Sequence, residues 1–369
     1  MNRPDRPPPA TDADPPAVPD YAVVVPTLGR PSLRTCLEAL VATQGPLPSR
    51  LVLVDDRPPH HPQGRRRDLG VPEVLRPVTT LVPGGGRGPA AARNAGWRAA
   101  GPVPWVVFLD DDVVPGPAWA RELARDLDRA GPRTAAVTAR IAVPLPTDRR
   151  PTDWERNTAG LATARWITAD MAYRREALEA VGGFDERFRR AFREDADLAL
   201  RALDAGWEIA AGDRRTSHPV RPADRWVSLR AQAGNADDVL MTRLHGRDWW
   251  DRAAAPRGRL PRHLLVTGAA LAAAGCALLG RPRAAALCAA GWLAGTAEFA
   301  WARVAPGPRT RAEIATMAAT SLLIPPAASW HWLRGLWLHR RVRPPASPYG
   351  TPPPGTPRAW SPAGEPVPS

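Results

Sequence analysis

The feature that most constrains the fold is an apolar run, residues 106–109, that ends abruptly in three adjacent carboxylates, Asp110, Asp111 and Asp112. A run of this kind is typical of a buried central strand of a parallel sheet. Three neighbouring acids repel one another, and the carboxyl edge of an open α/β sheet is where ligands bind. Two interpretations follow from this stretch alone: a divalent metal that carries a phosphorylated ligand, or a solvated acidic turn.

A strand–helix–strand unit precedes the acids. Residues 21–25 and 51–54 are short apolar runs, the first closed by Pro26 and the second by an acid pair that ends at Asp56. Leucines at helical spacing lie between them, over 31–41. Because a unit of this size forms a right-handed crossover with parallel strands, its loops open at the same edge as the three acids.

The remaining elements up to residue 245 complete an α/β pattern. The sequence predicts strands at 74–82, 135–143, 164–173 and 207–211, and helices at 89–100, 117–129, 174–181, 198–205 and 226–245. The run at 135–143 alternates only weakly and is expected at the edge of the sheet. The predicted fold class is therefore α/β, a mostly parallel sheet with flanking helices.

A glycine-rich loop, 84–88, leads into the helix expected at 89–100. Its spacing does not match the dinucleotide-binding fingerprint, because Pro89 occupies the last required position. Flexible backbone that leads into a helix N-terminus still favours an anion. Arg93 and Asn94 lie one turn into this helix.

The composition of the chain bears on its binding partners and on its cellular compartment. The formal net charge is +13, and all 50 basic residues are arginine, but they are spread thinly along the chain, so no nucleic-acid partner is expected. Cys36, Cys276 and Cys288 provide neither a disulfide framework nor metal-ligand spacing, which fits a reducing compartment. The Pro-rich ends, 1–19 and 343–369, are expected to be disordered.

Residues 260–340 are predicted to form membrane-associated helices. Three apolar segments are expected, at 263–279, 284–304 and 314–333. The first has no charge and lies at the short limit for a span, and the second carries Glu298 and Arg303. A proline pair, 325–326, breaks the third, and tryptophans cluster beyond it, as at a membrane interface. Two spans with a re-entrant or interfacial helix, three spans, and a soluble helical subdomain are the alternatives. Arginines flank every segment, so charge assigns no orientation.

Six short motifs occur in an order and spacing that are specific as a set. They are Val-Val-Val-Pro-Thr at 23–27, Val-Asp-Asp at 54–56, Ala-Arg-Asn-Ala-Gly at 92–96, Phe-Leu-Asp-Asp-Asp at 108–112, Gly-Gly-Phe-Asp-Glu at 182–186 and Glu-Asp-Ala-Asp-Leu at 194–198. The set resembles the family 2 glycosyltransferases, inverting enzymes with the GT-A fold that use nucleotide-diphospho-sugars. The resemblance covers about residues 21–246 and implies a GT-A domain over 20–250.

The resemblance implies a donor site at the ends of the first strands. Its nucleotide-sugar-binding residues would be Pro26, Thr27, Leu28, Asp56, Arg93, Asn94, Asp110 and Asp111. Asp56 would accept a hydrogen bond from the nucleotide base, and the turn at 26–28 would line the nucleoside. Asp111 is open to a second interpretation, as a solvated or structural acid between its two neighbours.

The resemblance also implies a divalent cofactor. Asp110 and Asp112 match the family's Asp-x-Asp signature, in which Mg²⁺ or Mn²⁺ bridges the last acid to the diphosphate. The metal would neutralise the charge that builds on the leaving nucleoside diphosphate. His218 is either a further metal ligand or an ordinary partnered or solvated histidine.

Catalysis is expected at a second acid pair. Asp195 matches the general base that takes the proton from the acceptor hydroxyl, and Glu194 would orient the loop or the acceptor. Acids in the first turn of a helix also suit its dipole, which is the alternative explanation. Two departures from the family pattern are Arg57, where glycine is usual, and Asp170, where asparagine is common in a region that contacts donor or acceptor.

The expected function is transfer of a single sugar to a lipid-linked or cell-envelope acceptor by a bacterial membrane protein whose catalytic domain faces the cytoplasm. A single transfer is expected because no Gln-x-x-Arg-Trp motif follows Asp195. A nucleotidyltransferase on the same kind of sheet and a non-catalytic membrane scaffold are the alternatives. The sequence does not specify the sugar, the base or the acceptor.

Overall fold

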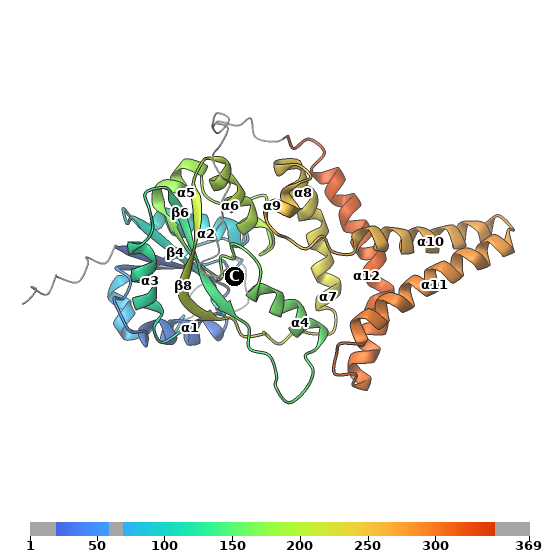
Figure 1. The fold of residues 1–369 in the computed structure, drawn as a ribbon, viewed down its shortest axis with the longest axis horizontal. Helices are drawn as coiled ribbons and strands as arrows, with labels where there is room; N and C mark the ends of the chain where they lie inside the picture. Colours follow the sequence, from blue (N-terminus) through green and yellow to red (C-terminus); the bar gives the residue numbers. More distant parts are fainter. Residues whose placement is uncertain (1–19, 59–68, 344–369) are drawn as a thin grey trace, which may run out of the picture.

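The computed structural model describes residues 20–58 and 69–343. They form an α/β domain followed by a set of long helices, two of which project away from the rest as a hairpin (Figure 1). The segments expected to be disordered, 1–19 and 343–369, lie outside the described residues except for Arg343.

The described part of the α/β domain is built on one sheet of eight strands in the order β3-β2-β1-β4-β7-β6-β8-β5. The strands are β1 (Tyr21–Thr27), β2 (Arg50–Asp55), β3 (Thr79–Pro83), β4 (Trp105–Leu109), β5 (Val114–Pro115), β6 (Thr134–Ala142), β7 (Asp170–Arg174) and β8 (Glu208–Ser217). The pairs β1–β2, β1–β4, β2–β3 and β6–β8 are parallel, whereas β7 runs antiparallel to β4 and β6, and β5 antiparallel to β8. The sheet is therefore mixed, and the predicted parallel crossover over β1 and β2 is confirmed.

Helices cover both faces of the sheet, which explains why its central strands are apolar without interruption. The helices of this domain are α1 (Ser32–Val41), α2 (Pro89–Ala99), α3 (Trp119–Asp128), α4 (Asp153–Ala159), α5 (Arg175–Val181) and α6 (Glu194–Asp204). In β1, Val23 and Val25 pack into the cluster that holds α1 and α3, and Val24 packs into the opposite cluster with α2, α5 and α6.

The C-terminal part is entirely helical. It consists of α7 (Val227–Ala231), a 3₁₀ turn (Gln232–Gly234), α8 (Asn235–His245), α9 (Trp249–Arg252), α10 (Leu260–Leu278), α11 (Pro282–Val304) and α12 (Arg311–Leu338). Of the helices that the structure describes, α10 is the one whose length and apolar composition would suit a membrane span, which by itself is weak evidence.

Several predicted elements differ from the observed ones. The strand at 135–143 is not an edge strand, because β8 is longer than expected and pairs along its open side. The strand expected at 74–82 begins as a 3₁₀ helix, Glu73–Val78, which contains Pro77. The strand expected at 164–173 begins only at Asp170.

Two helix boundaries were also predicted incorrectly. The helix expected at 226–245 is divided by the 3₁₀ turn between α7 and α8. The proline pair inside α12, by contrast, does not end that helix. Proline has a φ that suits a helix, and its cost is a lost hydrogen bond and a steric clash. Packing of the neighbouring Ile324 and Ala328, both buried, offsets that cost.

Candidate active site

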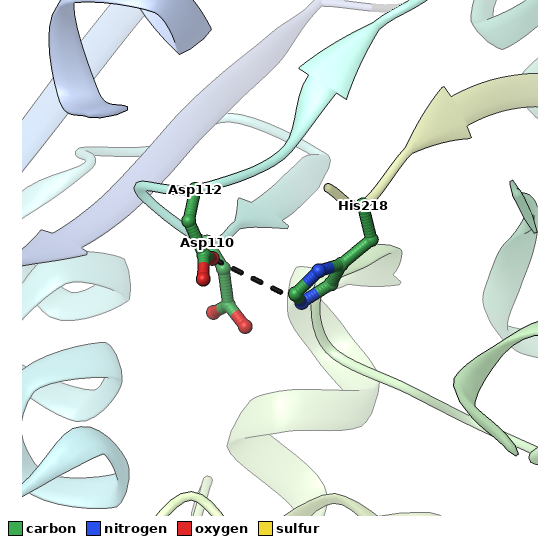
Figure 2. A group of neighbouring side chains, drawn as sticks. All are labelled: Asp110, Asp112 and His218. Atoms are coloured by element: carbon green, nitrogen blue, oxygen red, sulfur yellow. Dashed lines mark ion pairs between the residues drawn. The ribbon is translucent and has the colours of Figure 1, made fainter. Parts of the chain in front are cut away.

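The acid turn after β4 lies beside a histidine that follows β8. Ligand atoms of Asp110, Asp112 and His218 all lie within 4.8 Å of one another (Figure 2). The short strand β5 makes this juxtaposition, because Val114 pairs with Ser217 and thereby draws the turn before it toward His218. The backbone N–H of His218 is fixed by a 2.7 Å hydrogen bond that it donates to a carbonyl of β6.

Asp112 is buried and surrounded by charge. Burial and the neighbouring Asp110 raise the pKa of its carboxyl, while Arg221 and His218 act in the opposite direction. Arg221 Nε lies 2.8 Å from Asp112 Oδ2, an ion pair that lacks hydrogen-bond geometry. Two carboxylates and one imidazole are a donor set that fits Mg²⁺ or Mn²⁺, and one of the carboxylate oxygens, Asp112 Oδ2, is buried without a hydrogen bond among the described residues.

Asp111 points away from this cluster and is buried rather than solvated. Its carboxylate accepts hydrogen bonds from Thr27 Oγ1 at 2.7 Å and from the Leu28 N–H at 3.4 Å, and it pairs with Arg30 at 3.1 Å. Asp111 therefore holds the turn after β1 against the acid turn. Of the residues expected to line the nucleoside, Leu28 is the exposed one.

Arg93 joins the acid turn to the second acid pair. Its Nη2 donates to Asp110 Oδ1 at 2.7 Å, and its Nη1 donates to Glu194 Oε1 at 2.9 Å. The guanidinium is buried, so this bridge lies inside the protein. The sequence predicted that Arg93 binds the donor but did not predict the bridge, because the two partners of Arg93 are 17 and 101 residues away.

The second acid pair opens α6. Arg193, the residue before it, adopts a left-handed backbone with φ 77°, and Asp195 Oδ1 accepts a hydrogen bond from the Ala196 N–H at 2.7 Å. Burial raises the pKa of Asp195, opposed by that hydrogen bond and by Arg93. Burial and the charge of Asp195 also raise the pKa of Glu194. A raised carboxyl pKa is what a general base needs to work near neutral pH.

Asp56 anchors the glycine-rich loop. Its carboxylate accepts hydrogen bonds from the backbone N–H groups of Arg87 and Gly88 at 3.1 and 3.0 Å. Gly84 passes so close that a Cβ there would lie 2.6 Å from Asp56 Oδ1. The next residue, Arg57, is buried and pairs with Asp55 at 2.6 Å, an arrangement that the sequence did not reveal.

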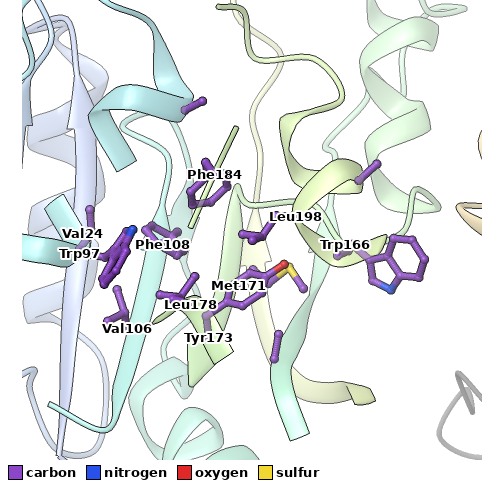
Figure 3. Close-up of a cluster of buried hydrophobic side chains, with 14 of the residues drawn as sticks. Val24, Trp97, Val106, Phe108, Trp166, Met171, Tyr173, Leu178, Phe184 and Leu198 are labelled. Atoms are coloured by element: carbon purple, nitrogen blue, oxygen red, sulfur yellow. The ribbon is translucent and has the colours of Figure 1, made fainter. Parts of the chain in front are cut away.

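Asn94 is engaged with the loop before α6. Its side chain accepts hydrogen bonds from the Phe184 N–H and from Trp97 Nε1, and donates to Phe184 O and Glu186 Oε1. Phe184 and Trp97 belong to the buried cluster on this face of the sheet (Figure 3). Asn94 thus fixes the Gly-Gly-Phe-Asp-Glu motif, although Phe184 of this motif lies 90 residues after Asn94 in the sequence.

Asp170 lies in the core of the sheet. It accepts hydrogen bonds from Trp119 Nε1 at 2.6 Å, from Arg214 Nε at 2.9 Å and from Thr216. Its exposed fraction is 1%. Asp170 therefore pairs with protein groups inside the sheet.

The predicted residues form one connected set. The Asp56 N–H donates to Thr27 O, Thr27 contacts Asp111, and Arg93 carries the connection from Asp110 to Glu194. A cavity of about 360 Å³ adjoins the set through Arg221, between α4, the loop after β8 and α12. Its lining includes Trp154, Arg221, Ser228 and Glu313.

Comparison with known proteins gives a family for the first part of the chain. Residues 22–182 match the family described as glycosyl transferase family 2, a segment that contains the acid turn and Arg93 and ends before Asp195. No curated protein matches.

Among solved structures, S. aureus TarS is 16% identical with a TM-score of 0.38, covering 62% of this chain and 41% of its own. The mannosyltransferase PcManGT from Pyrobaculum calidifontis, in complex with GDP-Man and Mn²⁺, is 21% identical with a TM-score of 0.49, covering 88% and 89%. GalNAc-T7 with UDP, GalNAc and Mn²⁺ is 17% identical with a TM-score of 0.41, covering 55% and 43%. This chain thus spans less than half of the first and third of these proteins. The similarity to glycosyl transferase family 2 therefore lies in residues 22–182, the segment that carries strands β1 to β7.

Proposed function

We propose that this protein moves one sugar from a nucleotide-diphospho-sugar to a hydroxyl of a lipid-linked or cell-envelope acceptor, with inversion at the anomeric carbon. The observation that carries the proposal is the Arg93 bridge, which joins a cluster able to hold a metal to a carboxylate pair with raised pKa values. A transferase of this kind needs both halves, one for the leaving diphosphate and one for the acceptor proton.

In this proposal the nucleotide-sugar donor binds at the ends of the first strands and at the acid turn. Asp110, Asp112 and His218 would hold Mg²⁺ or Mn²⁺, which supplies Lewis-acid stabilisation to the leaving diphosphate. The nucleoside would lie over the turn that contains Thr27 and Leu28. Asp111 holds that turn in place, because its carboxylate accepts hydrogen bonds from Thr27 Oγ1 and the Leu28 N–H.

In this proposal the acceptor hydroxyl is activated by residues at the start of α6. Asp195 takes the proton of the acceptor hydroxyl as its oxygen forms the new bond to the anomeric carbon, and the bond from that carbon to the diphosphate breaks. Glu194 Oε2 is buried and, within the described residues, has no hydrogen-bond partner, which supports a role in orienting the acceptor. The cavity beside Arg221 is the place we assign to the acceptor, because Arg221 lines it and pairs with Asp112 of the metal cluster, and because residues of α12 form one of its walls.

The setting we propose is a bacterial membrane, with the catalytic domain on the cytoplasmic side. The apolar helices after residue 260 support this setting, and they make a membrane-bound acceptor the natural substrate class.

The test separates proton transfer from donor binding. Asp195→Asn should abolish transfer while leaving metal-dependent binding of the nucleoside diphosphate within about twofold, because the Asp195 carboxylate accepts its hydrogen bond from the Ala196 N–H of its own helix. Asp204→Asn, the same change at the exposed far end of α6, is the matched control and should leave both unchanged. Loss of nucleotide binding together with transfer would remove Asp195 from the role of base.

A thermal-shift panel of UDP-, GDP- and TDP-sugars, with and without Mn²⁺, identifies the donor. Stabilisation that requires the metal supports the transferase. Release of pyrophosphate from a nucleoside triphosphate would instead indicate a nucleotidyltransferase, and a protein that responds to no donor would fit a scaffold.

A further inference from the structure

The hairpin of α10 and α11 leaves an unusual amount of apolar surface uncovered. The two helices project from the rest of the molecule (Figure 1), and only 6% of the apolar stretch of α10 is buried inside the protein. Leu265, Leu271, Leu278 and Leu287 are 75%, 69%, 89% and 76% exposed. Apolar surface of this extent is stable in water only when something covers it.

The charges on the hairpin stand at its two ends. On α10 no charged residue follows Arg262 before the helix ends at Leu278, which is about 24 Å of helix. On α11 none lies between Arg283 and Glu298, about 22 Å. The hydrocarbon core of a bilayer is about 30 Å thick, and arginine side chains extend toward the headgroups to make up the difference.

The helices also lack a polar face. A helix that lies flat on a membrane carries a charged face opposite its apolar one. Between their terminal charges α10 and α11 present alanine, leucine and glycine on all sides, which is the pattern of a helix surrounded by lipid.

The base of the hairpin is fixed to the catalytic domain by polar contacts. Glu298 pairs with Arg259 and Arg262, and Arg303 Nη2 donates to Asp153 Oδ2 of α4 at 2.7 Å. Helix α12 is less exposed than the hairpin along part of its length. Gly335 lies so close to α8 that a Cβ there would be 2.8 Å from Ala236 Cα, so this part of α12 packs on α8.

We propose that the α10–α11 hairpin crosses a lipid bilayer, with the tip at 281–283 among the headgroups of the far leaflet and Glu298 level with those of the near leaflet. The bilayer is favoured over a second copy of the chain, because the uncovered apolar surface extends around both helices and their charges lie only near the base and the tip.

The hairpin also assigns the side. The start of α10 and the end of α11 both lie next to the catalytic domain. The charges that flank these two helix ends are therefore on the same side of the bilayer. The near side carries Arg257, Arg259, Arg262, Arg309 and Arg311, and the tip carries Arg281 and Arg283. Arginine-rich flanks remain in the cytoplasm, so the catalytic domain lies there and the tip lies on the opposite side.

Cysteine labelling of the full chain in intact bacterial cells tests the crossing. Cys276→Ser and Cys288→Ser remove the hairpin thiols, and Cys36 stays because it is fully buried. In this background Arg281→Cys places a thiol at the tip, and Arg257→Cys places one at the base. A membrane-impermeant maleimide should label the tip variant in intact cells and the base variant only after lysis.

Other labelling patterns overturn the proposal in distinct ways. A tip thiol labelled only after lysis would show that the hairpin does not cross. Labelling of the base thiol in intact cells would show that the catalytic domain lies outside the cytoplasm.

A second measurement does not depend on introduced thiols. Leu271→Arg, in the middle of α10, should move most of the protein from the carbonate-washed membrane fraction to the supernatant or to aggregates. Leu145→Arg, the same change at an exposed leucine of the catalytic domain, should leave it in the membrane. If the unmodified chain purifies without detergent as a soluble dimer, the second copy covers the hairpin and the proposal is wrong.

Discussion

At the scale of single residues, Arg93 decides whether the two halves of the site stay together. It is buried and pairs with Asp110 and Glu194, which are both partly or fully withdrawn from water. Removing one member of a buried ion pair costs about 3–5 kcal/mol, because the remaining charges lose their partner. The bridge therefore stabilises the fold and sets the geometry of the site at the same time.

Arg93→Met tests this directly. We expect the melting temperature to fall by several degrees and metal-dependent nucleotide binding to weaken, because Asp110 loses the donor that positions it. Arg98→Met, at an exposed arginine one turn further along α2, should stay within about 0.5 kcal/mol of the wild type. An unchanged melting temperature for Arg93→Met would show that the bridge is not formed.

The pH dependence of transfer follows from the same contacts. Burial raises the folded-state pKa of Asp195 above its ordinary value, and the base must be ionised, so the rate should fall on the acid side at a pH above about 3.9. Arg93→Met removes a charge that lowers this pKa and should move the acid limb to higher pH. The profile of kcat/KM for donor turnover measures the shift, and an acid limb that moves to lower pH would contradict the assignment.

Stability responds with the opposite sign. Because the folded-state pKa values of Asp195 and Glu194 are raised, these groups favour folding when protonated, and that contribution is lost as the pH rises through those values. The acid pair therefore costs folding free energy at neutral pH, as expected of groups kept for chemistry.

At the scale of elements, helix α2 carries Arg93 and Asn94 and is positioned by a glycine. A Cβ at Gly96 would lie 2.3 Å from Val24 Cγ1 of β1, so α2 packs on the sheet at backbone distance. Val24 and Trp97, the residue after Gly96, both belong to the buried cluster on this face of the sheet (Figure 3).

Gly96→Ala should therefore cost about 1–3 kcal/mol through overpacking and should displace Arg93 from Asp110. Thermal unfolding measures the first effect and Mn²⁺ affinity the second. Gly160→Ala is the matched control, since a Cβ there meets nothing within 4 Å and the backbone is helical. Equal effects at the two glycines would mean that α2 does not depend on close approach.

Local patterns predicted most of the elements but not their long-range partners. The strand–helix–strand unit and the acid turn are recognisable because each is encoded within about 30 residues. The place of β6 inside the sheet depends on β8, more than 60 residues later, and its weak alternation does not reveal that neighbour. The Arg214 pairs with Asp126 and Asp170 were missed for the same reason, since buried charges are recognised only through partners brought close by folding.

At the scale of the whole molecule, one ion pair joins the proposed membrane part to the catalytic domain. Arg303 of α11 donates to Asp153 of α4 at 2.7 Å and also to Thr320 of α12 at 2.7 Å. Asp153 lines the cavity beside Arg221, so the same carboxylate borders the space that we assign to the acceptor. The position of the bilayer and the position of the acceptor are thereby coupled through α4.

Asp153→Asn keeps the shape of this side chain and removes its charge. Arg303 is buried and would lose its carboxylate, and a hydrogen bond to a charged group is worth about 1.5–3 kcal/mol. We expect faster trypsin cleavage in the connection between α11 and α12, at Arg309 or Arg311, in protein bound to membranes. Mn²⁺ binding should be unchanged, because Asp153 contacts none of the metal-cluster residues.

Asp148→Asn, at an exposed acid in the loop before α4, should alter neither property. If Asp153→Asn weakens Mn²⁺ binding as strongly as it speeds cleavage, then the ion pair holds the metal cluster rather than the junction. If it changes neither, the charge of Asp153 does not position the hairpin, and the hydrogen bond from Arg156 to Arg303 O and the packing of α12 on α8 do so instead.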